Sequence, residues 1–294
     1  MLILLQTPFT PSNENHEDLS IFVGLLGLFI VFILPILYFI QSKRKYRPSD
    51  LRRKYRPVLA KIPYYNRLSA KEQKRFRKRV QLFINTKSFI PRSKGFLLTD
   101  EMIAQIAAAA VELSFGFRRF SFDQFQKILV YPDDYYSTIS KRYHRGEVNL
   151  RGFIILSWAA FKEGYDDPED GINLGIHEMA HALKLENKIR NSDYNFISQR
   201  ALKELENHYH RFVGIGGPLQ GFFRDYAQTN IHEFFAVSCE NFLERSLAFK
   251  KKDPEFYNLM TQILNQDPLL GGKLNIPKAK KADLNNSSGP VLRY

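Results

Sequence analysis

Two histidines and a glutamate in the stretch "GIHEMAHALKLEN", Gly175 to Asn187, have the types and spacing needed for metal-assisted hydrolysis. Residues four apart lie on one helical face, with Cβ atoms about 5–6 Å apart, so His177 and His181 can hold one zinc ion. Glu178 is rotated to the adjacent face, where it can take a proton from water. The alternative is an amphipathic helix with two incidental histidines, because an apolar stripe already follows this helix. Catalytic zinc usually takes three protein ligands, so a third donor must come from elsewhere.

A later stretch, "FFRDYAQTNIHEFFAVSCENFLERS", offers Tyr226, Glu233 and Glu240 at intervals of seven residues. Glu233 follows Asn230 in a capping-box pattern, and on this evidence its capping of a helix is as good an explanation as ligation. Glu240 lies on nearly the same face about 10 Å further along the axis. It therefore cannot share the metal with Glu233, but it can orient a ligating histidine.

The other histidines are weaker metal-ligand candidates. His232 would point about 100° away from Glu233 on a helix, so the two are not expected to bind the same ion. His208 and His210 are two residues apart and point to different sides of a helix. We expect both to be surface residues.

The elements that position these side chains are predicted from local signals. Asp167 is expected to cap the histidine-bearing helix, with Pro168 at its first position. A second, buried helix is expected to begin after Thr99 in "TDEMIAQIAAAAVELSF". "FQKILVYP", closed by Pro132, and "RGFIILSW" read as strands, and the second is expected to present a free edge to an extended peptide. The pattern predicts an α+β body, mostly helical with a small sheet.

Composition bounds the class of protein. The chain has 294 residues, of which 44% are hydrophobic, enough for a sizeable core. Its single cysteine, Cys239, excludes an internal disulfide and a cysteine-based zinc knuckle.

The N-terminal region predicts a membrane anchor. Ile21 to Ile40 contains 20 residues without a charge, long enough to cross the hydrocarbon core as a helix. Between Gln41 and Lys94, 19 Lys and Arg stand against 2 Asp and Glu, and the first of these basic residues directly follow the apolar run. The positive-inside rule therefore predicts a single-pass protein with its N-terminus outside and its main domain in the cytoplasm. Nucleic-acid binding by the basic stretch Lys71 to Val80 is not expected, because no recognised reading module accompanies it. We expect a solvated helix face there.

Several ordered motifs together resemble the Mlc titration factor A family of zinc peptidases, whose site is similar to that of lethal-factor-type metallopeptidases. They are "IILSW", "NLGIHEMAHALK" and "DYAQTNIHEFFAVSCENFLE", with "FINTKSF", "AQIAAAAVELSF" and "ILVYPDDY" upstream. The likeness covers roughly Lys54 to Leu270. It implies a zincin-like body that binds one Zn²⁺ through His177, His181 and Glu233, with Tyr226 assisting catalysis.

The chain departs from the family pattern at Lys184, where an aspartate is common, and at Ile231 and His232, where small residues or proline are common. Lys184 lies one turn beyond His181 and makes the site more electropositive. This departure bears on substrate preference and zinc affinity more than on the identity of the ligands.

The combined expectation is a membrane-anchored zinc peptidase, with Glu178 as general base and Tyr226 as a hydrogen-bond donor to the oxyanion. The alternative is a regulatory binding protein that sequesters a transcriptional repressor. The expected organisation is a short arm (1–20), a transmembrane helix (21–40), a basic linker (41–54), a zinc peptidase domain (55–272) and a disordered tail (273–294). The expected partners are a peptide or protein substrate, the lipid bilayer and, in the alternative, the repressor.

Overall fold

The computed structural model describes residues 27, 29–33, 55–117, 120–137, 141–189, 196–214 and 217–272. The chain divides into two units, Met1–Arg47 and Pro48–Tyr294. In the first unit the structure describes one short π-helix, η1 (Phe29–Ile33). Most of the predicted span Ile21 to Ile40, the predicted linker 41–54 and the predicted tail 273–294 lie outside the described residues. None of the helices within those residues is both long and apolar enough to cross a membrane.

A four-stranded mixed sheet forms one side of the second unit. Its order is β1 (Ser88–Pro91), β2 (Lys127–Tyr131), β6 (Phe153–Ser157) and β5 (Gly146–Asn149). The first three strands are parallel, and β5 pairs antiparallel with β6. The strands predicted from "FQKILVYP" and "RGFIILSW" are therefore confirmed as β2 and β6. The expected free edge on β6 is wrong, because β6 lies between two partners and β5 forms the edge.

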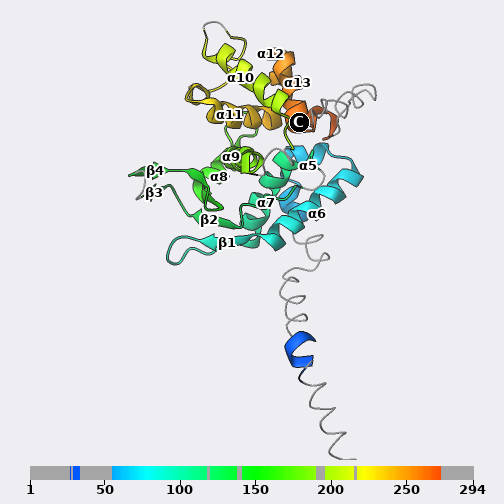
Figure 1. Cartoon of the computed structure of the whole chain (residues 1–294), viewed down its shortest axis with the longest axis vertical. Coiled ribbons are helices and arrows are strands. Elements are labelled where there is room, and N and C mark those ends of the chain that lie inside the picture. The colour runs from blue at the N-terminus through cyan, green and yellow to red at the C-terminus, as the bar shows by residue number, and fades with distance from the viewer. Residues whose placement is uncertain are drawn as a thin grey trace, which may run out of the picture. The chain divides into compact units, whose positions relative to one another are not determined.

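A separate two-stranded hairpin, β3 (Tyr135–Ser137) and β4 (Arg142–His144), joins the sheet strands β2 and β5 in the sequence. It projects to one side of the second unit in Figure 1.

Helices make up most of the second unit, which confirms the helical majority. Short α4 (Arg56–Leu59) and α5 (Pro63–Arg67) precede the long α6 (Ala70–Thr86), and α6 packs along α7 (Asp100–Ser114). The predicted start of α7 is confirmed, because the Thr99 side chain accepts a hydrogen bond from the Met102 amide at 3.2 Å. α8 (Trp158–Asp166) follows β6 directly. The central helix is α9 (Leu174–Ile189), which contacts α7 on one side and α11 (Ile231–Glu244) on the other.

The remaining helices gather around α11. They are α10 (Gln199–Val213), α12 (Ser246–Lys252) and α13 (Pro254–Ile263), and Figure 1 shows them on the side of α11 away from the sheet. Phe234 of α11 stacks on Phe256 of α13 with ring centroids 5.3 Å apart. Two 3-10 turns, η3 (Asp225–Gln228) and η4 (Pro268–Leu270), complete the described part of the unit. The stacking of Phe234 on Phe256 packs α11 against α13.

The basic stretch predicted to be a solvated face of α6 has a partly buried member. Arg79 donates to the carbonyl oxygens of Ser114, Phe115 and Phe117 at 2.9–3.0 Å. These acceptors lie at the C-terminal end of α7, where helix carbonyls lack partners within the helix. Burial lowers the pKa of Arg79 to about 10. At least one basic residue of this stretch therefore stabilises the packing of α6 on the end of α7.

Candidate metal centre and cleft

His177 and His181 project from one face of α9, as their spacing predicts. Their Nε2 atoms lie 3.1 Å apart, with the rings nearly perpendicular. The start of this helix differs from the prediction: Asp167 ends α8, and α9 begins only at Leu174. Asn173 is the capping residue, because its side-chain oxygen accepts a hydrogen bond from the Ile176 amide at 3.0 Å. The histidines therefore lie in the first two turns of α9.

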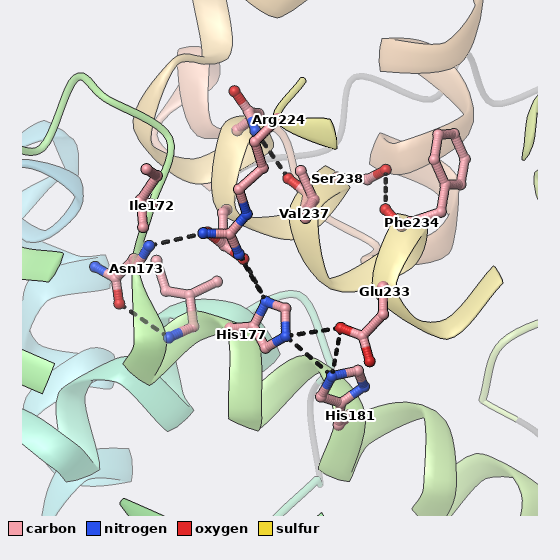
Figure 2. A network of polar contacts seen from close by, with 12 residues as sticks. Ile172, Asn173, His177, His181, Arg224, Glu233, Phe234, Val237 and Ser238 are labelled. Atoms are coloured by element: carbon pink, nitrogen blue, oxygen red, sulfur yellow. Dashed lines mark hydrogen bonds and ion pairs between the residues drawn. The ribbon is translucent and has the colours of Figure 1, made fainter. Parts of the chain in front are cut away.

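Glu233 of α11 faces the two histidines (Figure 2). Its Oε2 atom lies 3.0 Å from His177 Nε2 and 3.3 Å from His181 Nε2. The cap of α11 is Asn230, whose side chain accepts hydrogen bonds from the His232 and Glu233 amides. The Glu233 side chain is thus turned toward the histidines, and the alternative that it merely caps α11 has no support in the geometry.

These three residues fit a metal ion by chemistry and by spacing. One donor atom from each lies within 4.8 Å of the other two. Two imidazole nitrogens and a carboxylate oxygen form a donor set that zinc commonly takes in catalytic sites. The His177 Nδ1 atom is engaged elsewhere, which directs Nε2 toward the shared point.

The group that engages His177 Nδ1 is Glu240, fully buried on α11. Its Oε1 atom lies 2.5 Å from His177 Nδ1 and accepts a hydrogen bond from Arg224 at 2.7 Å. Its Oε2 atom accepts from the Asn173 backbone amide at 2.9 Å. Glu240 therefore occupies the orienting position predicted from its spacing. Arg224 and Asn173 were not predicted as members of this network; the Asn173 cap signal was present in the sequence, whereas nothing in the spacing pointed to Arg224.

The electrostatics of the centre favour positive charge beside Glu233. Burial lowers the pKa of His177, but hydrogen bonds to Glu233 and Glu240 outweigh it and raise the pKa to about 10. Burial also opposes ionisation of Glu233, yet hydrogen bonds from His177 and His181 hold its pKa well below the usual range. Glu233 is therefore a carboxylate at neutral pH, the form in which it can bind a cation.

Glu178 is buried beside the centre, with 5% of its surface exposed. Burial raises its pKa above the ordinary value, although the two histidines oppose this. The backbone of the edge strand β5 lies directly against it. A Cβ atom added to Gly146 would lie 2.5 Å from Glu178 Cδ and 2.6 Å from Cγ, closer than real contacts allow. A larger residue at Gly146 would therefore displace the Glu178 carboxylate or the strand, a constraint that the sequence pattern did not reveal.

Tyr226 lies in η3, with its ring centroid 5.9 Å from that of His177. The side chain is half exposed. Burial of the hydroxyl and the nearby Glu233 carboxylate raise its pKa to about 12. The phenol is therefore protonated at neutral pH and can donate a hydrogen bond.

Two adjoining cavities, of about 810 and 550 Å³, form a cleft around the centre. Both are lined by His177, Glu178 and Tyr226, and both are bordered by β4 and by Gly146 of β5. The larger cavity continues along β5 past Glu147 and Val148. The centre therefore lies where the two cavities meet.

The other histidines that the structure describes lie outside the group of three donors. The prediction that His208 is a surface residue is wrong, because it is buried and stacks on Phe256 with ring centroids 4.5 Å apart. Its neighbour two positions on, His210, is exposed as expected. Helix periodicity placed His208 and His210 on different sides of α10, but it did not show which side packs against α13.

A fold of this kind, with two histidines and a downstream glutamate converging in a cleft, defines a class of metallopeptidase-like proteins. The family model of the glucose-regulated metallo-peptidase M90 matches residues 39–264, and the chain belongs to this family. The chain is 27% identical over 231 residues to Mlc titration factor A of Escherichia fergusonii, covering 71% of this chain and 84% of that protein. It is 28% identical over 230 residues to Mlc titration factor A of Enterobacter sp., with the same coverage. An uncharacterized protein of Synechocystis sp. is 28% identical over 237 residues, covering 71% of this chain and 82% of that protein.

Proposed function

We propose that this chain is a zinc-dependent peptidase whose metal is held by His177, His181 and Glu233. The convergence of their three donor atoms beside the buried Glu178, inside a cleft, carries the proposal. Membership of a metallopeptidase family supports the same reaction class. Zinc held there would supply a Lewis acid that polarises a peptide carbonyl and makes water more acidic.

The chain's own side chains have distinct parts in this proposal. Glu178 accepts the proton of the attacking water and delivers it to the leaving amine, because its carboxylate is fixed beside the histidines. Tyr226 donates a hydrogen bond to the carbonyl oxygen as negative charge develops on it. Glu240 acts through His177: it holds the ring with Nε2 turned toward Glu233.

The proposed substrate is an extended peptide that adds to the edge of the sheet. β5 has β6 on one side, and its residues Gly146, Glu147 and Val148 line the larger cavity on the other. Main-chain hydrogen bonds to such an edge bind peptides largely independently of their sequence. This places the peptide backbone across the junction of the two cavities.

Metal analysis and peptide hydrolysis test the function together. The protein should bind about one zinc ion per chain, and hydrolysis of a capped model peptide should stop with a chelator and return with zinc. Glu178→Gln should keep zinc and lose hydrolysis, because it removes the proton acceptor but no ligand. Zinc-loaded protein that hydrolyses no peptide, or full activity in Glu178→Gln, would contradict the proposal.

A second candidate function is regulatory binding. The name of two relatives, Mlc titration factor A, refers to titration of a protein called Mlc. We propose as the alternative that this chain binds a transcriptional repressor, with weak or absent peptidase activity. Retained binding of such a partner by Glu178→Gln, together with no hydrolysis by the zinc-loaded wild type, would favour this alternative.

We further propose a membrane-anchored protein with the domain organisation predicted from the sequence. The uncharged run Ile21 to Ile40 and the basic residues that follow it support this topology, with the N-terminus outside and the catalytic domain in the cytoplasm. A membrane-impermeant reagent should label a cysteine introduced at Asn13 in intact cells, whereas it should label a cysteine introduced at the exposed Lys162 only after lysis. Deleting residues 1–40 should move the protein from washed membranes to the supernatant; membrane retention of the deletion variant would contradict the anchor.

A further inference from the structure

The two cavities of the cleft differ in how their positive charges are compensated. In the smaller cavity, Arg145 forms ion pairs with Glu163 and Asp134, and Arg224 pairs with Glu240. These two arginines therefore already have carboxylate partners, and a third arginine, Arg142, lines both cavities.

The larger cavity contains two lysines without such partners. We call the part of this cavity that is lined by Lys184, Lys188, Gln199, Leu202, Asn230 and His232 the Lys184 half. Within the part of the chain that the structure describes, neither lysine forms an ion pair with a carboxylate. Two of the acidic residues that line this cavity, Glu178 and Glu233, belong to the metal centre, and the third, Glu147, lies on β5.

Lys184 is held in place inside the cleft. Its Nζ atom donates to the Ile231 carbonyl oxygen at 3.2 Å and lies 5.7 Å from the centre of the Phe235 ring. Burial lowers its pKa to about 8, so it is still mostly an ammonium ion at pH 7. A backbone carbonyl satisfies only one of the three ammonium donors. A half-buried cation with donors to spare favours an anionic ligand.

The carboxylates nearest to Lys184 are engaged by other cations. The carboxylates that act on Lys184 from a distance, Glu206 and Glu233, form their ion pairs with Lys203 and the two histidines instead. The Lys184 half is thus a partly desolvated pocket of positive charge next to the metal centre.

The direction of β5 determines which part of a substrate reaches this pocket. Gly146 lies against Glu178 and lines both cavities, whereas Val148, two residues on, lines the larger cavity. A peptide that runs antiparallel to β5 therefore places the residues N-terminal to the cleaved bond in the larger cavity, which Lys184 also lines.

We propose that the Lys184 half binds an acidic side chain of the substrate, N-terminal to the cleaved bond, and gives the protein a preference for acidic peptides. This inference rests on the proposed peptidase function and specifies its substrate class. Lys184 is the specificity-determining residue, and Lys188 adds to the attraction from the rim.

Matched peptides test the proposal. Two peptides are acetylated at the N-terminus and amidated at the C-terminus, so that no terminal charge contributes. They differ only in having Glu or Gln at the residues before the cleaved bond. Mass spectrometry of the products identifies which bond is cleaved. The wild type should cleave the Glu peptide with a kcat/KM roughly 5- to 10-fold higher than that for the Gln peptide. This ratio corresponds to the free energy expected from one partly exposed charge-assisted hydrogen bond. Lys184→Gln should bring the two values together. Lys162→Gln, an exposed lysine on α8 outside both cavities, should leave the preference unchanged.

A binding measurement separates failure of this inference from failure of the peptidase function. Fluorescence anisotropy should show that zinc-loaded Glu178→Gln binds the Glu peptide more tightly than the Gln peptide, and that adding Lys184→Gln removes the difference. Equal cleavage of both peptides, or a preference that survives Lys184→Gln, would overturn the proposal while leaving the peptidase function intact. No hydrolysis of either peptide, with Lys184-dependent binding retained, would overturn the peptidase function alone.

Discussion

Replacing Gly146 with alanine tests whether the edge strand positions Glu178. The φ angle of Gly146 is outside the left-handed region, so alanine causes no backbone strain there. The new Cβ would nevertheless lie 2.5 Å from Glu178 Cδ. Carbon atoms pack at about 3.5–4.0 Å, so the carboxylate or the strand must retreat by about 1 Å. A displacement of this size in a catalytic group can cost about 100-fold in rate.

The assay for Gly146→Ala combines kcat with metal content. We expect zinc content to equal that of the wild type, because none of the three donors is touched, while kcat falls by roughly 30- to 100-fold. Gly214→Ala is the matched control, since a Cβ there would meet nothing closer than 3.4 Å and the residue lines neither cavity. A kcat within about 3-fold of the wild type in the zinc-loaded variant would refute the positioning role.

Three further predictions address the centre and the core. Glu233→Ala should lose zinc, whereas Glu240→Ala should weaken its binding by about 10–100-fold, as measured by competition with a chelating dye; the reverse order would show that the third ligand is misassigned. Tyr226→Phe should keep the fold and zinc but lower kcat; an unchanged kcat would leave Tyr226 without a catalytic part. Burial raises the pKa of Glu112 from an ordinary value of 4.5 to about 8 in the folded protein. The folded state therefore holds a proton that the unfolded state loses, and the free energy of unfolding is highest below about pH 4.5 and falls as the pH rises to 8. Urea unfolding should therefore show Glu112→Gln gaining stability over the wild type between pH 5 and pH 8.5, and a constant difference would contradict this.

Local signals predicted the elements whose positions depend on adjacent residues. Thr99 caps α7, and β2 and β6 are formed by the runs of apolar residues that predicted them. His177 and His181 share a face because helix geometry alone brings residues four apart together. The seven-residue spacing of Glu233 and Glu240 likewise placed both on the side of α11 that faces α9.

The features that were missed depend on contacts between segments distant in sequence. Asp167 has the residue type of a helix cap, but it directly follows the last residue of α8. Asn173 caps α9 instead, after an intervening loop. The edge position of β5 follows from how three strands pair, which no single strand encodes. Gly146 is needed only because Glu178 occupies the space beside it.

The centre depends on the register between two helices more than on any single ligand. Glu233 and Glu240 lie two turns apart on α11, and His177 of α9 lies between them, with Nε2 3.0 Å from the first and Nδ1 2.5 Å from the second. Arg224 donates to Glu240 Oε1 at 2.7 Å, and Figure 2 shows the Arg224 side chain reaching toward His177. Because both imidazole nitrogens are engaged, sliding α11 along α9 by one residue would break both contacts together. The aromatic packing that holds α11 against α13, including Phe234 on Phe256, therefore helps to keep the three donor atoms together without touching them.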